Sequence, residues 1–144
     1  MRKAGFLTAL PVQDRLATRA GFYELTAPVG YYSAKAGREF TAQAGFQTNY
    51  VTGRKLVVVR RIVQDKMNPA AVIHDLLYDT GAVSRMVADA VFLEAMLELD
   101  VAAWRAYAAY TAVRVCGWAF YRAAPAPRLE QHPAGELERE PELE

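Results

Sequence analysis

The feature that most constrains the fold of this chain is a carboxylate in the apolar stripe of a predicted helix. Over residues 84–99 the apolar side chains recur at helical spacing, and Asp89 falls on the same side as Phe92, Leu93 and Met96. A carboxylate on a face that packs against the core is costly unless it has a partner. We therefore expect a donor beside Asp89.

Two residues are candidates to pair with Asp89. Arg85 lies one turn earlier on the same predicted helix. His74 lies on the preceding predicted helix, at about residues 69–79. It reaches Asp89 if the two helices form an antiparallel hairpin across the short loop Thr80–Val83. We predict a helix–helix pair of His74 and Asp89, with Arg85 as the local partner.

Capping residues mark the ends of these helices and of a third one, at about 101–122. The expected signals are Asn68 as N-cap with Pro69 in the first position, Gly81 as the left-handed closing residue, Ser84 as the second N-cap and Asp100 as the third. On the second helix, Glu94 and Glu98 are predicted to point away from the apolar face.

The third helix carries two stripes that both need burial. One consists of Trp104, Ala108, Thr111, Val115 and Trp118, and the other of Tyr107, Tyr110, Arg114 and Tyr121. Such a helix is either central in its own domain or half inside an assembly, and both alternatives stay open. If the Trp stripe faces the core, the Tyr and Arg stripe is the candidate interface, because these residue types are enriched at binding hot spots.

The N-terminal part has the texture of short strands separated by Gly and Pro. Candidate strands are Gly5–Leu10, Phe22–Thr26, Gly30–Ser33, Glu39–Ala42, Phe46–Asn49 and Leu56–Val63, with turns at Ala36–Gly37 and Thr52–Gly53. An antiparallel β region within residues 5–63 that precedes three helices predicts an α+β fold.

Residues 1–123 are expected to form a single domain, and residues 124–144 an extended tail. The chain has 144 residues, enough for one domain with a core. From residue 128 onward, six Glu face two Arg, a net charge of −4, in a Pro-rich segment that cannot pack against itself. Leu129 and Leu137 are the tail residues that we expect at an interface with a partner.

Composition bounds the environment and the partners. The formal net charge of +1 gives no case for nucleic-acid binding. The single cysteine, Cys116, cannot form an intrachain disulfide, which suits a reducing cytoplasm, and its thiol is predicted to be buried. The longest apolar segment contains Arg105 and Arg114, so no transmembrane segment is expected.

The helical segments resemble a known family. The residues that carry the likeness are AAVIHDLLYDTG, VSR, ADAVFLEAML and AYTAVRVCG, within Val29 to Gly117. They resemble a phage and prophage family known as domain of unknown function 1353. Members tend to carry a GF-x-TD-x-AS element before the HD helix, and this chain has Gly45-Phe46-Gln47-Thr48-Asn49, with Asn49 in place of the family's Asp.

A looser resemblance links the HD-x-x-Y pattern of His74, Asp75 and Tyr78 to the secreted calcium-dependent phospholipases. It implies that His74 activates water, that Asp75 binds calcium and that Asp89 orients His74.

Two functions follow from these patterns and likenesses. We expect a non-enzymatic phage structural protein of the tail or head-to-tail assembly, with no cofactor, present in a virion that is assembled in the host cytoplasm. Its partners would be other phage structural proteins or copies of itself. The alternative is a hydrolase with a catalytic His74–Asp89 dyad and calcium on Asp75, used in entry or lysis. A structural role for the pair is favoured, because the sequence offers no nucleophile, oxyanion donor or second metal ligand beside it.

Overall fold

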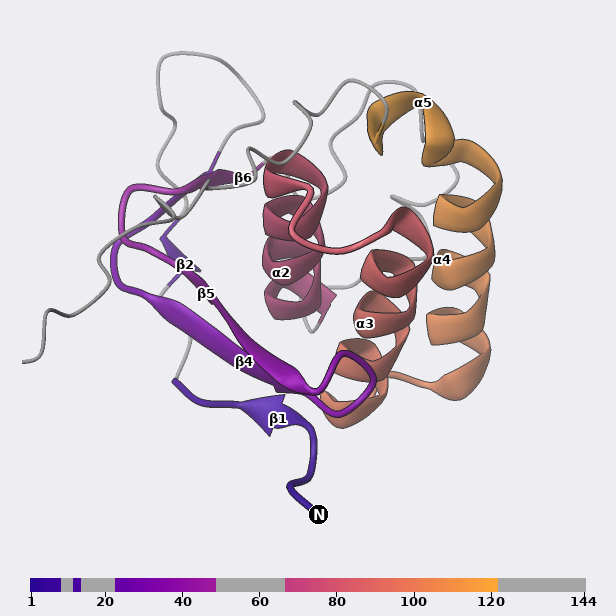
Figure 1. The fold of residues 1–144 in the computed structure, drawn as a ribbon, viewed down its shortest axis with the longest axis horizontal. Coiled ribbons are helices and arrows are strands. Elements are labelled where there is room, and N and C mark those ends of the chain that lie inside the picture. The colour runs from indigo at the N-terminus through magenta and orange to yellow at the C-terminus, as the bar shows by residue number, and fades with distance from the viewer. Residues whose placement is uncertain (9–11, 14–22, 49–66, 122–144) are drawn as a thin grey trace, which may run out of the picture.

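A computed structural model of the protein describes residues 1–8, 12–13, 23–48 and 67–121 (Figure 1). The elements in chain order are β1 (Gly5–Phe6), β2 (Val12–Gln13), β3 (Tyr23–Leu25), β4 (Val29–Ser33), β5 (Arg38–Ala42), β6 (Gln47–Thr48), α2 (Asn68–Thr80), α3 (Arg85–Glu98), α4 (Ala103–Cys116) and α5 (Trp118–Tyr121). Antiparallel strands followed by three long helices confirm the predicted α+β fold. The predicted strand Leu56–Val63, the turn Thr52–Gly53 and the tail 124–144 lie outside the described residues.

The described strands form two small antiparallel sheets, with the orders β1-β4-β5 and β2-β3-β6. The hairpin of β4 and β5 is the best developed part, with Tyr31 opposite Phe40 in its register. Both of these side chains are buried, whereas Glu39 and Thr41 are exposed, which is the alternation of a half-buried strand. Gly37 has a φ of 66°, which confirms the predicted turn.

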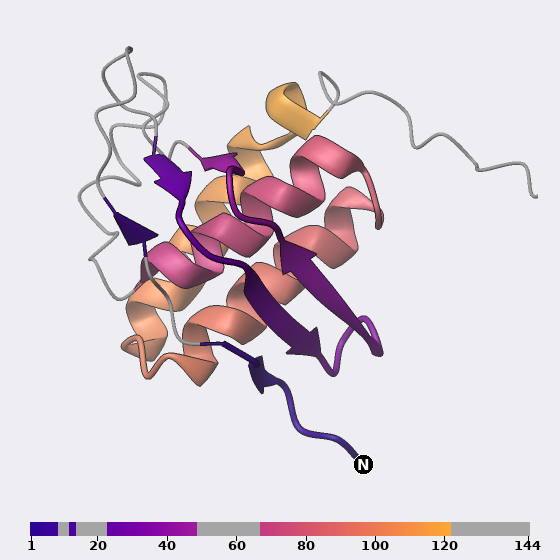
Figure 2. The ribbon, with the colours of Figure 1, turned by 90° about the vertical axis from the view of Figure 1, so that its left-hand side faces the viewer.

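The helices lie on one side of the strands, with α2 and α3 between the strands and α4 (Figures 1 and 2). About half of the residues of α2 and α3 are therefore buried, and these two helices supply about half of the core among the described residues. The core side chains of the two helices include Val72, Ile73, Leu77, Val91, Phe92 and Met96. No helix within the described ranges is long and apolar enough to cross a membrane.

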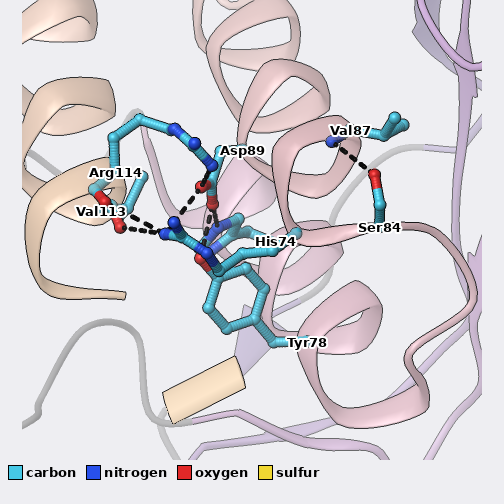
Figure 3. Close-up of polar contacts among 8 residues, drawn as sticks. His74, Tyr78, Ser84, Val87, Asp89, Val113 and Arg114 are labelled. Atoms are coloured by element: carbon cyan, nitrogen blue, oxygen red, sulfur yellow. Dashed lines mark hydrogen bonds and ion pairs between the residues drawn. The ribbon is translucent and has the colours of Figure 1, made fainter. Parts of the chain in front are cut away.

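The predicted signals at two helix ends are confirmed. Gly81 has a φ of 60°, and its N–H donates to the Leu77 carbonyl at 3.1 Å, which closes α2. The Ser84 hydroxyl accepts a hydrogen bond from the Val87 N–H at 3.4 Å at the start of α3 (Figure 3).

The two other predicted N-caps are wrong. The cap of α2 is Met67, which has no capping side chain, and Asn68 already lies in the helix. Ala102 precedes α4, whereas Asp100 has a φ of 55° and its N–H donates to the Leu97 carbonyl. Asp tolerates this left-handed conformation, so Asp100 closes α3 instead of opening α4.

The helical wheel predicts that Glu94 points away from the core, but in the structure it does not. It is half-buried against the β4–β5 hairpin, where it accepts hydrogen bonds from the Tyr31 hydroxyl at 3.1 Å, the Ser33 hydroxyl at 2.6 Å and the Lys35 N–H at 3.0 Å. Burial together with the Glu94 charge raises the pKa of Tyr31. A wheel cannot show which side of a helix a distant hairpin covers.

The predicted orientation of the third helix is wrong. The large residues of the Trp stripe are exposed: Trp104 by 66%, Val115 by 65% and Trp118 by 52%. The buried side of α4 carries small residues instead, namely Ala106, Ala109 and Val113, which let α4 pack closely on α3. Cys116, predicted to be buried, is exposed with them. The helix also divides into α4 and α5 around Gly117.

Candidate functional site

Asp89 lies at the centre of a polar cluster between the helices (Figure 3). It is fully buried, and all of its partners are donors. Its Oδ1 accepts from the Tyr78 hydroxyl at 2.6 Å and lies 2.9 Å from His74 Nε2. Its Oδ2 lies 2.9 Å from Arg114 Nη1 and 3.5 Å from Arg85 Nη1. Four side chains thus supply the donors that the buried Asp89 carboxylate needs.

Three helices supply these groups. His74 and Tyr78 lie one turn apart on α2, Arg85 and Asp89 one turn apart on α3, and Arg114 comes from α4. The closing residues of α2 and the cap of α3 reverse the chain over a short loop, so the two helices run antiparallel. The structure thus brings His74, Asp89 and Arg85 together, as the sequence predicts.

Arg114 is the member of the cluster that sequence reasoning assigned elsewhere. It was a candidate for an outward interface, but its guanidinium donates to Asp89 and about two thirds of its side chain is buried. Its helix is rotated so that Arg114 faces α3. The helix has no acidic residue of its own, so an arginine on it can pair only with a carboxylate from another element. This is the one sequence signal that could have indicated the pairing.

Arg85 serves two groups at once. Besides its long contact with Asp89, its Nη1 donates to the carbonyls of Val113 at 3.4 Å and Arg114 at 3.1 Å. These carbonyls lie in the last turn of α4, where a cation is favoured by the helix dipole. The Val113 carbonyl also accepts the Gly117 N–H at 2.7 Å. Arg85 therefore ties the start of α3 to the end of α4.

Gly117 makes room for Tyr78. A Cβ at this position would lie 2.5 Å from the Tyr78 hydroxyl and 2.3 Å from the Val113 carbonyl oxygen, so neither atom could stay in place. Tyr121 packs its ring edge-on against Tyr78 at 5.3 Å between centroids and donates its hydroxyl to the Val83 carbonyl at 2.8 Å. Tyr121, another predicted interface residue, is therefore used inside the domain.

The charges of the cluster favour an ionised Asp89. Burial alone would raise the pKa of its carboxyl group, but hydrogen bonds from His74, Tyr78 and Arg114 outweigh burial and hold this pKa below its ordinary value. Burial, and then the hydrogen bond to Asp89, raise the pKa of Tyr78. The hydrogen bond to Asp89 also raises the pKa of Arg114. Because a carboxylate only accepts, the proton between it and His74 lies on Nε2.

The second ring nitrogen of His74 is Nδ1. The residue is 7% exposed, and its ring lies against Tyr78 and Phe92, with centroids at 4.2 and 4.6 Å. Among the residues that the structure describes, no hydrogen bond reaches Nδ1. A buried polar atom without a partner is uncommon in a folded protein.

Asp75, the predicted calcium ligand, lies next to His74 on α2. It is half-buried and accepts a hydrogen bond from the Thr48 hydroxyl of β6, so the GF-x-T element meets the HD helix at this carboxylate. Asn49, the next residue of that element, lies outside the described residues. Within the described ranges there is no group of three or more His, Cys, Asp or Glu residues that could hold a metal ion.

The remaining predicted interface residues divide into two groups. Tyr107 is exposed and Tyr110 is half-buried on α4. Leu129 and Leu137 lie outside the described residues.

The fold and the cluster define a small α+β protein in which three helices meet on one buried carboxylate. The family model described as "Protein of unknown function (DUF1353)" matches residues 23–113, more than half of the chain, and the protein belongs to this family. The match covers the whole polar cluster except Arg114, which follows its last residue directly. No curated protein and no solved structure matches the chain.

The lowered pKa of Asp89 predicts an acid-sensitive fold. A carboxyl group whose pKa is lower in the folded than in the unfolded state contributes stability above the unfolded value, about 3.9, and loses it as the pH falls toward the folded value. Urea unfolding between about pH 6 and about pH 2 should show the free energy of unfolding falling below about pH 4. The fall should be smaller in Asp89→Asn, which has no carboxyl group to protonate.

Glu98→Gln is the matched control for this experiment, because Glu98 is an exposed carboxylate on the same helix. It should keep the wild-type pH dependence. Equal slopes for wild type and Asp89→Asn would contradict the assignment.

Proposed function

We propose that this protein is a structural component of a phage particle, in the tail or the head-to-tail assembly, and that it acts through protein–protein contacts. The observation that carries the proposal is the outward face of α4 and α5, here called the contact stripe. It consists of Trp104, Tyr107, Thr111, Val115 and Trp118, all of them exposed. The link to a phage comes from the resemblance of the helical segments to phage and prophage proteins.

The spacing of the residues in the contact stripe supports its role as a binding surface. Single exposed apolar residues are normal on any protein. Here a Trp, a Tyr, a Thr, a Val and a second Trp follow one another every three or four residues along one helix face. Trp and Tyr are the residue types that most often carry binding energy at interfaces. The opposite face of α4 packs against the domain with small residues, and the large residues of the stripe are more than half exposed.

The proposal includes the nature of the partners and the place of action. The partners are other structural proteins of the particle or further copies of this chain, and no nucleic acid is needed. The protein would be found in the virion after assembly in the host cytoplasm. It uses no cofactor in this role.

Particles of the phage or prophage that encodes this protein provide the test. The wild-type protein should be recovered with purified particles. The double variant Trp104→Ala, Tyr107→Ala should fold, because both side chains are exposed, but its share in the particles should fall at least about tenfold, as expected when two hot-spot residues are lost.

Met86→Ala is the control for this test, since Met86 is 64% exposed but lies on α3 outside the contact stripe. It should be incorporated like the wild type. Absence of the wild-type protein from particles, or normal incorporation of the double variant, would refute the proposal.

A hydrolase is the second candidate, and the state of His74 favours it. Its Nε2 is held by Asp89 while its Nδ1 has no hydrogen-bond partner among the described residues, as a general base requires. In this candidate Nδ1 would take a proton from water as the water oxygen attacks an ester carbonyl, and the alkoxide that leaves would take the proton back. Asp89 would hold the ring.

Calcium belongs to this candidate through Asp75, which the looser resemblance singles out. The described residues supply no cluster of ligands around Asp75, so the base chemistry is assigned to His74 and Asp89 alone. The substrate class would be a phospholipid, met during entry or lysis.

Fatty-acid release from vesicles of phosphatidylcholine and phosphatidylglycerol, with and without about millimolar calcium, tests the hydrolase. The candidate predicts release that His74→Gln abolishes while the variant still unfolds cooperatively. Asp79→Asn, an exposed change on the same helix, should leave release unchanged. No release by the wild type, together with a melting temperature that calcium does not move, would remove this candidate.

A further inference from the structure

We infer that the contact stripe binds the contact stripe of a second copy of this chain, with the two α4 helices antiparallel around a two-fold axis at Thr111. This inference rests on the proposed role of the stripe as a contact surface and names its partner. It is carried by the symmetry, the area and the charge of the stripe.

The contact stripe is nearly the same when read in either direction from Thr111. Trp104 and Trp118 lie seven residues to either side, and Tyr107 and Val115 lie four residues to either side. An antiparallel partner related by a two-fold axis would therefore set Trp against Trp and Tyr against Val on both halves. Such self-complementarity is what a two-fold interface between identical subunits requires.

The backbone keeps this face continuous across the break at Gly117. The Gly117 N–H donates to the Val113 carbonyl at 2.7 Å, and the Tyr121 N–H donates to the Gly117 carbonyl at 3.0 Å. Both bonds join residues four apart, as in an α-helix. Trp118 therefore follows Val115 on the same side, and its exposure agrees with that position.

The area of the contact stripe is sufficient for a dimer at the weaker end of the range. Aromatic side chains bury roughly 150–250 Å² each when fully enclosed, and the three in the stripe are more than half exposed. With Val115 they offer on the order of 500 Å² per copy, or about 1,000 Å² for the pair. This is the lower bound for a specific interface.

Charge selects the antiparallel arrangement. Arg105 lies over the ring of Trp104, with its Cζ 5.0 Å from the centroid, at one end of the stripe. A parallel pair would place the two Arg105 side chains together, with no acidic residue on α4 to balance them. In the antiparallel pair they lie about 18 Å apart along the helix axis, which exceeds the Debye length of about 8 Å at physiological salt. The two helix dipoles also oppose each other.

Cysteine cross-linking tests the pairing in the full-length protein. In a Cys116→Ser background, Thr111→Cys places its thiol on the two-fold axis, so mild oxidation should give a covalent dimer. Val115→Cys is the matched control, because its two copies would lie about 12 Å apart along the axis, too far for the 4.4–6.8 Å between Cα atoms in a disulfide. The dimer yield of Thr111→Cys should exceed that of Val115→Cys several-fold.

The other outcomes overturn the inference in distinct ways. Equal cross-linking of both variants would mean a parallel pair, and cross-linking of neither, with a monomer in sedimentation at every concentration, would mean that no pair forms. A monomer whose Trp104→Ala, Tyr107→Ala form is still lost from particles would refute self-pairing and leave the proposed function intact. A dimer that persists in the double variant would place the interface elsewhere.

Discussion

The structure depends on one buried carboxylate. Asp89 receives hydrogen bonds or ion pairs from two residues of α2, one of α3 and one of α4, and it has no exposed surface. Because a lone carboxylate in the core is costly, the three helices must arrive in a register that brings these donors to the same place. The cluster therefore sets how the helices pack, beyond what their apolar residues alone would specify.

The same cluster connects the interior to the surface. Arg114 binds Asp89 and Arg85 binds the last carbonyls of α4, so the rotation of α4 about its axis is fixed. With that rotation the small residues face α3 and the contact stripe faces outward. The cluster has a different role in each of the two candidate functions. A structural protein needs it as a staple that presents the stripe, whereas a hydrolase needs Nδ1 of His74, to which no described residue makes a hydrogen bond.

The part of the site that could be predicted from sequence is the part encoded locally. Asp89 lies on an apolar face and therefore needs a partner. The short loop between Gly81, which closes α2, and Ser84, which caps α3, brings His74 close to it. Arg114 could not be assigned to the cluster from sequence. A helical wheel predicts that the face with the large apolar residues is buried, whereas α4 packs through its alanines, and this packing sets its rotation. Glu94 was misplaced for a related reason: its donors come from a hairpin about 60 residues earlier, and only the tertiary fold brings it there.

The free energy of unfolding of Asp89→Ala tests the central claim most directly. Removing the carboxylate leaves four donors without their shared acceptor, so the loss should be about 3–5 kcal/mol. It should exceed the loss in His74→Ala, which leaves Asp89 with three donors. Asp79→Ala, an exposed acid on α2, should change stability by less than about 0.5 kcal/mol. A loss in Asp89→Ala no larger than that of Asp79→Ala would contradict the account.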